Sequence, residues 1–201
     1  MDLGDLPVPD TLAATGAFEV AELFHSPAHL HHSVRSYLWA AALAAQEGTP
    51  YDAELLYVAT MLHDIGLTSS FEHPSTSFEE VGGRVAYVFA AGAGWPIGRR
   101  ERVDEIVARH MGWTGAPADD WESHLLQRST TVDVTGGGVE LIPAELRVEV
   151  LARWPRLAFA QEFAAHFRAQ AARGAELAAG RAVARGALQR MAVNPLDAAR
   201  P

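Results

Sequence analysis

The chain has 201 residues, of which 49 % are hydrophobic and 20 % charged, a composition that suits one globular domain with a sizeable core. It contains no cysteine and no lysine, which excludes disulfides, thiolate metal sites and Schiff-base lysines. The formal net charge of −9 argues against nucleic acid as a partner, because phosphate backbones bind clustered positive charge.

The sequence also lacks the patterns of membrane and secreted proteins. No apolar run reaches the roughly 18 residues that a membrane-spanning helix requires, so no membrane association is expected. The N-terminus carries Asp2 and Asp5, which is unlike a signal peptide. We therefore expect a cytoplasmic protein whose partner is a small-molecule substrate, with homo-oligomerisation left open.

Helical periodicity dominates the chain after an irregular arm that ends at about Pro9. We expect helices over residues 10–24, 29–46, 52–65, 77–91, 99–111 and 119–135, a short helix from Pro143, and one or two helices over 157–191. Gly66 is the expected C-cap of the third helix, and Ser77 with Glu80 forms a capping-box pattern at the start of the fourth.

Strand patterns are nearly absent, since only residues 139–142 alternate in polarity, and only briefly. The sequence therefore predicts an all-α helical bundle that forms a single domain over residues 1–201. Its core is expected over about residues 20–170, with an additional C-terminal helical segment over about 171–193.

His63 and Asp64 stand at the end of an otherwise apolar helix. An ionised Asp beside a His in apolar surroundings costs free energy unless it is paired or bound to a metal. Consecutive helical side chains point about 100° apart, so one metal can bind both residues only at the helix end. We favour a metal site over the alternative, a His near the helix dipole followed by an Asp that starts a turn.

Asp133 is a second acidic residue in an apolar setting, between Val132 and Val134. A carboxylate that faces a core needs a partner. From the residues alone, an arginine such as Arg128 or Arg35 is the better candidate for that partner.

Three histidines, His29, His31 and His32, lie at the start of the long Ala-rich helix. Periodicity does not choose among them, because this helix is expected to be buried on several sides. A surface or capping role explains His29 and His31 as well as a functional one does.

Together these residues resemble a known pattern: a His followed by Ser-x-Arg, a His-Asp pair on the next helix, and a distal Asp near the end of a later helix. This is the pattern of the HD superfamily of metal-dependent hydrolases. The chain resembles the cyanamide hydratase branch in particular, in ordered segments between about Leu6 and Phe167. These segments are residues 32–37, 61–66, 77–83, 106–110, 130–136 and 155–157. The resemblance does not extend to the tail after about Arg168.

The resemblance implies one divalent metal ion in the core of the bundle, with His32, His63, Asp64 and Asp133 as its ligands. It implies zinc, and a set of two His and two Asp also accepts Fe²⁺ or Mn²⁺. The implied enzyme is a hydratase that adds water to a nitrile, converting cyanamide to urea through a metal-bound hydroxide.

Asp64 and His110 are the expected proton-transfer residues, although His110 is explained equally well as a histidine at a helix C-terminus. Arg35 is expected to support carboxylates around the metal rather than to bind substrate. His73 and His110 leave a dinuclear site open.

Four further residues are candidates for the substrate pocket. Glu79 is one, although a Glu in the first turn of a helix is also favoured by the helix dipole. Thr130, one turn before Asp133, is another, with core packing as its alternative. Phe71 and Trp113 lie in loops that flank the expected site and are candidates for shaping a small cavity.

Two alternative functions stay open from the sequence. The first is an HD-type phosphohydrolase acting on a nucleotide or small phosphate ester, which would need convergent cationic groups. Few arginines lie near the motifs and lysine is absent, which weakens this alternative. The second is a non-catalytic module in which a metal stabilises the helices around a ligand pocket.

Overall fold

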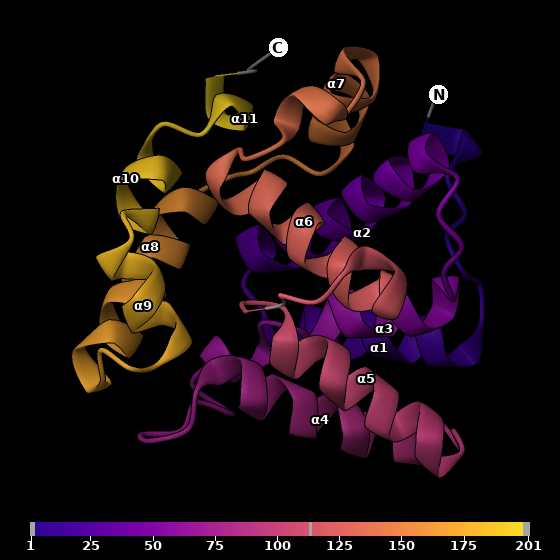
Figure 1. Ribbon diagram of the computed structural model, residues 1–201, viewed down its shortest axis with the longest axis horizontal. Coiled ribbons are helices and arrows are strands. Elements are labelled where there is room, and N and C mark those ends of the chain that lie inside the picture. Colours follow the sequence, from indigo (N-terminus) through magenta and orange to yellow (C-terminus); the bar gives the residue numbers. More distant parts are fainter. Residues whose placement is uncertain (1–2, 113, 199–201) are drawn as a thin grey trace.

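The structure, a computed structural model, describes residues 3–112 and 114–198. Every regular element in those residues is a helix, which confirms the all-α prediction (Figure 1). The α-helices are α1 (Leu12–Phe24), α2 (Pro27–Glu47), α3 (Ala53–Leu62), α4 (Phe78–Gly92), α5 (Ile97–Arg109), α6 (Trp121–Thr135), α7 (Ala144–Arg153), α8 (Phe159–Arg173), α9 (Ala178–Ala184), α10 (Ala187–Ala192) and α11 (Pro195–Ala198). Short 3-10 helices are η1 (Leu3–Asp5), η2 (Ile65–Leu67), η3 (Pro117–Asp119) and η4 (Val139–Leu141). None of these helices is both long enough and apolar enough to span a membrane.

Helix α2 is buried on nearly all sides and forms the centre of the bundle. The Ser26 side chain accepts a hydrogen bond from the backbone of His29 at its N-terminus, and Gly48 ends it with a φ of 64°. The small side chains of the alanines within residues 40–44 let α1, α3 and α6 pack against this helix. Helix α6 crosses over α2 (Figure 1), which brings residues far apart in the sequence into contact.

The end of α3 forms a corner on which the site is built. The helix ends at Leu62, earlier than predicted, because the backbone of Asp64 (φ −101°, ψ 5°) leaves the helical conformation and leads into η2. Helix α4 packs closely against this corner, since a Cβ at Gly82 would lie only 2.8 Å from the carbonyl oxygen of His63. The glycine therefore sets how near α4 approaches His63.

Three local predictions need correction. Gly66 lies inside η2, where a Cβ would collide with the backbone of Phe78, so close packing rather than a C-cap requires a glycine there. Ser77 precedes α4, but its side chain accepts no capping hydrogen bond and no capping box forms with Glu80. Residues 139–142 contain η4, so their brief alternation produces no strand.

The C-terminal helices α8, α9 and α10 lie together at one side of the bundle (Figure 1). In α8 the rings of Phe159, Phe163 and Phe167 follow one another with centroids 4.9 and 4.6 Å apart. Side chains of α9 and α10 pack on these rings and form a second apolar cluster. The one or two helices predicted here are three, because Gly174 and Gly186 lie in the breaks between them, the latter with a φ of 80°.

Candidate metal centre

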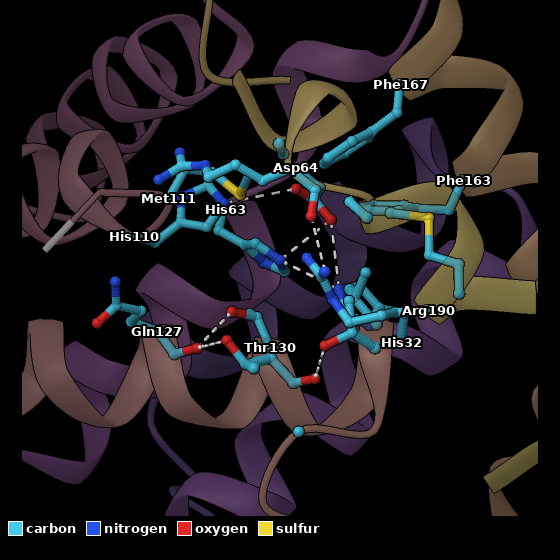
Figure 2. A pocket seen from close by; sticks show the side chains of 18 residues that line it. His32, His63, Asp64, His110, Met111, Gln127, Thr130, Phe163, Phe167 and Arg190 are labelled. Atoms are coloured by element: carbon cyan, nitrogen blue, oxygen red, sulfur yellow. Dashed lines mark hydrogen bonds and ion pairs between the residues drawn. The ribbon is translucent and has the colours of Figure 1, made fainter. Parts of the chain in front are cut away.

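Three possible metal ligands converge where α2 passes the end of α3. His32, His63 and Asp64 each offer one ligand atom, and these atoms all lie within 4.8 Å of one another. Oδ2 of Asp64 is 3.3 Å from Nε2 of His32 and 3.0 Å from Nε2 of His63 (Figure 2). Burial would raise the pKa of Asp64, but the adjacent His63 and His32 hold it well below its ordinary value. The site is therefore a buried carboxylate facing two imidazoles.

Burial lowers the pKa of His32, but Asp133 and Asp64 raise it overall. When both rings are neutral, the hydrogen bonds at their Nδ1 atoms leave the facing Nε2 atoms without a proton. Nδ1 of His63 lies 2.7 Å from the carbonyl oxygen of Thr60, and Nδ1 of His32 lies 2.7 Å from Oδ2 of Asp133. A neutral ring that donates from Nδ1 carries a lone pair on Nε2. These two Nε2 atoms are 3.2 Å apart, and neither oxygen of Asp64 has a hydrogen-bond partner among the described residues. Three electron-rich atoms facing one another fit a divalent cation.

Asp133 lies behind the His32 ring and not beside the three converging atoms. Its Oδ1 accepts hydrogen bonds from Nε of Arg35 at 2.8 Å and from Nε1 of Trp39 at 3.0 Å. Its Oδ2 accepts from Arg35 at 2.8 Å as well as from His32. Such a carboxylate fixes the orientation of a metal-binding imidazole. The role of Asp133 as a metal ligand stays a prediction.

Arg35 is completely buried and holds this carboxylate with two parallel hydrogen bonds. A further nitrogen of Arg35 donates to the carbonyl oxygens of Trp154 and Pro155. The guanidinium is thus bound by groups behind the metal site and does not line the cavity in front of it.

The three histidines at the start of α2 have different surroundings in the structure. His32 faces the site, whereas Nδ1 of His31 lies 2.9 Å from the carbonyl oxygen of Pro155. His29 lies 3.3 Å from the hydroxyl of Ser26 and packs against the ring of Phe163. Neither His29 nor His31 belongs to the group of converging ligand atoms.

His110, at the C-terminal end of α5, brings a third imidazole to the site. Its Nδ1 lies 2.7 Å from the carbonyl oxygen of Val107, and its Nε2 lies 3.8 Å from Oδ1 of Asp64. Burial and the neighbouring His63 lower the pKa of His110 to about 4. The ring is therefore neutral at pH 7, with a free lone pair on Nε2 directed toward Asp64.

Of the other predicted pocket residues that the structure describes, one lines the cavity and two do not. Thr130 lines the cavity and donates its hydroxyl to the carbonyl oxygen of Leu126 at 2.9 Å. Glu79 is buried in the first turn of α4 but does not line the cavity, and burial raises its pKa. Phe71 packs edge-on against Phe24 and lines a separate groove, so we withdraw it as a pocket residue.

Trp113, the remaining predicted pocket residue, lies outside the described residues.

A cavity of about 420 Å³ opens onto the converging ligands. His32, His63, Asp64 and His110 line one part of it, and Phe163 and Phe167 line another (Figure 2). The C-terminal helices complete the lining with Ala182, Arg185, Ala187, Arg190 and Met191.

Sequence reasoning missed the contribution of the C-terminal helices. The spacing of Phe159, Phe163 and Phe167 at every fourth residue indicates one apolar face of a helix, and this pattern was available. It does not say which part of the bundle that face covers. In the structure the ring of Phe159 stacks on His32, with centroids 4.4 Å apart.

Comparisons with known proteins agree with this geometry. A family model described as HD domain matches residues 30–153 of the chain. Two cyanamide hydratases of Saccharomyces cerevisiae, DDI2 and DDI3, are each 29 % identical to it over 164 residues. The aligned part covers 79 % of this chain and 72 % of each yeast protein. His32, His63, Asp64 and Asp133 all lie within the residues that the family model matches.

Proposed function

The chain belongs to the HD-domain family, and we propose that it is a metal-dependent hydratase that adds water to a nitrile. The observation that carries this proposal is the convergence of Nε2 of His32, Nε2 of His63 and the carboxylate of Asp64, three buried ligand atoms that all lie within 4.8 Å of one another. The likeness to two cyanamide hydratases supports a nitrile as the group that reacts.

His32, His63 and Asp64 would hold the metal, with Asp133 as the predicted fourth ligand. We propose zinc, because imidazole ligands favour it, although Fe²⁺ and Mn²⁺ accept the same ligand types. Such an ion, when bound, lowers the pKa of water to about 7 and so makes hydroxide available at neutral pH.

We propose that His110 moves the proton in this reaction. Its Nε2 lies 3.8 Å from Oδ1 of Asp64 and, in the neutral ring, offers a lone pair that would accept a proton from the attacking water. The water oxygen forms a bond to the nitrile carbon while one π bond of the C≡N group opens onto nitrogen. Nε2 of His110 then returns the proton to that nitrogen, and with cyanamide the product tautomerises to urea.

The walls of the cavity favour this chemistry. Phe163 and Phe167 are buried aromatic residues beside the ligands, and they limit the access of bulk water to the reacting atoms. In water-poor surroundings the charges of the site interact more strongly than they would in solution.

The test is urea release from cyanamide by the purified chain, with bound metal quantified in the same sample. The proposal expects urea in proportion to bound metal, and loss of urea in Asp64→Asn at an unchanged circular dichroism spectrum. The matched control is Asp10→Asn, which replaces an exposed carboxylate. Phosphate release from a nucleotide without urea would favour the phosphohydrolase instead. Bound metal with neither product would favour a non-catalytic module.

A further inference from the structure

The segment of residues 174–198 forms part of the cavity wall, although it lies outside the residues matched by the HD-domain model. Ala187 and Met191 of α10 are buried in the aromatic cluster of α8, which fixes the segment beside the site. The shape and charge of this wall therefore come from a part of the chain that the family match does not describe.

The cavity is much larger than cyanamide requires. Cyanamide has three non-hydrogen atoms and displaces on the order of three waters, or about 90 Å³ at about 30 Å³ per water. The cavity of about 420 Å³ lies within the range of about 300–1,000 Å³ usual for larger ligands. Most of its volume is thus available to a substrate that extends away from the metal ligands.

Two arginines on this wall carry positive charges that form no ion pair with the described residues. Arg185 and Arg190 both line the cavity, and no ion pair joins either of them to a carboxylate of the described residues. Each donates one hydrogen bond to a backbone carbonyl: Arg190 to Arg185 at 2.8 Å, and Arg185 to Arg181 at 3.2 Å. Arg156, by contrast, is held by Asp197. The remaining guanidinium donors of Arg185 and Arg190 are available to a ligand.

Asp64, which the proposed function assigns to the metal, is the only acidic residue in the described lining. The wall formed by the C-terminal segment is therefore positively charged, although the formal charge of the whole chain is −9. Guanidinium groups form their strongest hydrogen bonds with oxyanions, which they bind through two parallel donors.

We propose that the substrate is an extended nitrile with an oxyanionic group at its other end, and that Arg185 and Arg190 bind this group. This inference rests on the proposed function. The nitrile lies at His32, His63 and Asp64, and water adds across C≡N to give a carboxamide. Carboxylate and phosphate are the two oxyanions that this arginine pair suits.

Turnover is tested with matched pairs of nitriles on the metal-loaded chain. The acids are cyanoacetate, 3-cyanopropanoate and 4-cyanobutanoate, and each is compared with its neutral amide. A charge-assisted hydrogen bond predicts a KM about 10-fold lower for the acid at the best chain length. Arg185→Gln and Arg190→Gln should each remove most of this preference. The control Arg181→Gln, in the same segment but outside the cavity lining, should keep it. Equal KM values for acid and amide at every length would overturn the proposal for carboxylates.

Binding is tested separately from turnover, by thermal melting of the metal-free chain with glutarate or with glycerol 3-phosphate. We expect one of them to raise the Tm of the wild type and of Arg181→Gln, but not of the double variant Arg185→Gln/Arg190→Gln. A response to glycerol 3-phosphate alone identifies the oxyanion as a phosphate. No response to either anion, or an equal response in the double variant, overturns the proposal. If no nitrile is hydrated, the proposed function fails, and the melting data alone decide whether the arginines bind an oxyanion.

Discussion

Replacing Asp133 by asparagine tests how the buried charges behind His32 are held together. Asp133 is fully buried and accepts hydrogen bonds from Arg35, Trp39 and His32. Asparagine keeps the shape but removes the charge, so Arg35 is left with a buried positive charge and no full negative charge opposite it. Removing one partner of a buried pair costs about 3–5 kcal/mol. For a domain of this size such a loss lowers the Tm by about 10 °C.

The free energy of unfolding is measured by guanidinium chloride titration followed by circular dichroism, with a chelator present so that metal loss does not contribute. The matched control is Asp120→Asn. Asp120 is also buried, but its partner Arg102 is partly exposed and keeps Glu122 as a second carboxylate, so the expected cost is only about 1 kcal/mol. The double variant Arg35→Met/Asp133→Asn should recover part of the loss, because it leaves no unpaired buried charge. A cost below about 1 kcal/mol for Asp133→Asn would refute this account of the cluster.

Three further predictions concern other parts of the molecule. His110→Gln should lower kcat for cyanamide by about 10²–10⁴-fold with bound metal unchanged; loss of metal in this variant would instead make His110 a ligand. Gly82→Ala should lower the free energy of unfolding, measured by chemical denaturation, by about 1–3 kcal/mol, because its Cβ would lie 2.8 Å from the carbonyl oxygen of His63. In the control Gly92→Ala the new Cβ meets open space, so this variant should not be destabilised. Burial raises the pKa of Asp120, but Arg102 lowers it overall to below 3.8. The stabilisation from ionised Asp120 is therefore fully present above its unfolded-state pKa of 3.8 and is lost as the pH falls through the lower folded-state pKa. The free energies of unfolding of the wild type and of Asp120→Asn should thus converge at low pH, and a difference that persists there contradicts this.

Much of the fold could be predicted because its determinants are local. Apolar residues at helical spacing located the helices α1 to α7 to within a few residues, and the same pattern marked His63 and Asp64 as anomalous at the end of α3. The family resemblance, carried by short ordered segments, is confirmed by the HD-domain match.

The remaining features depend on contacts between distant segments. Periodicity did not choose His32 on α2, because that helix is buried on nearly all sides. The surroundings of Asp133 depend on how α6 crosses α2, which no local pattern encodes. Phe71 was expected at the site because of its place in the loop after His63, but the loop directs it to Phe24. Arg185, at the end of α9, and Arg190, on α10, reach the cavity through the packing of these two helices on α8.

The central claim is that His32, His63 and Asp64 form a divalent metal site, and metal content tests it most directly. The chain is purified without added chelator, and its bound metals are quantified by mass spectrometry in the wild type and in His63→Ala. The control is His31→Ala, which removes a neighbouring imidazole that lies outside the ligand group. The account predicts about one divalent ion per chain in the wild type and in the control, and a loss of about 10-fold or more in His63→Ala. A metal-free wild type that does not take up zinc, or equal metal content in all three proteins, would contradict it.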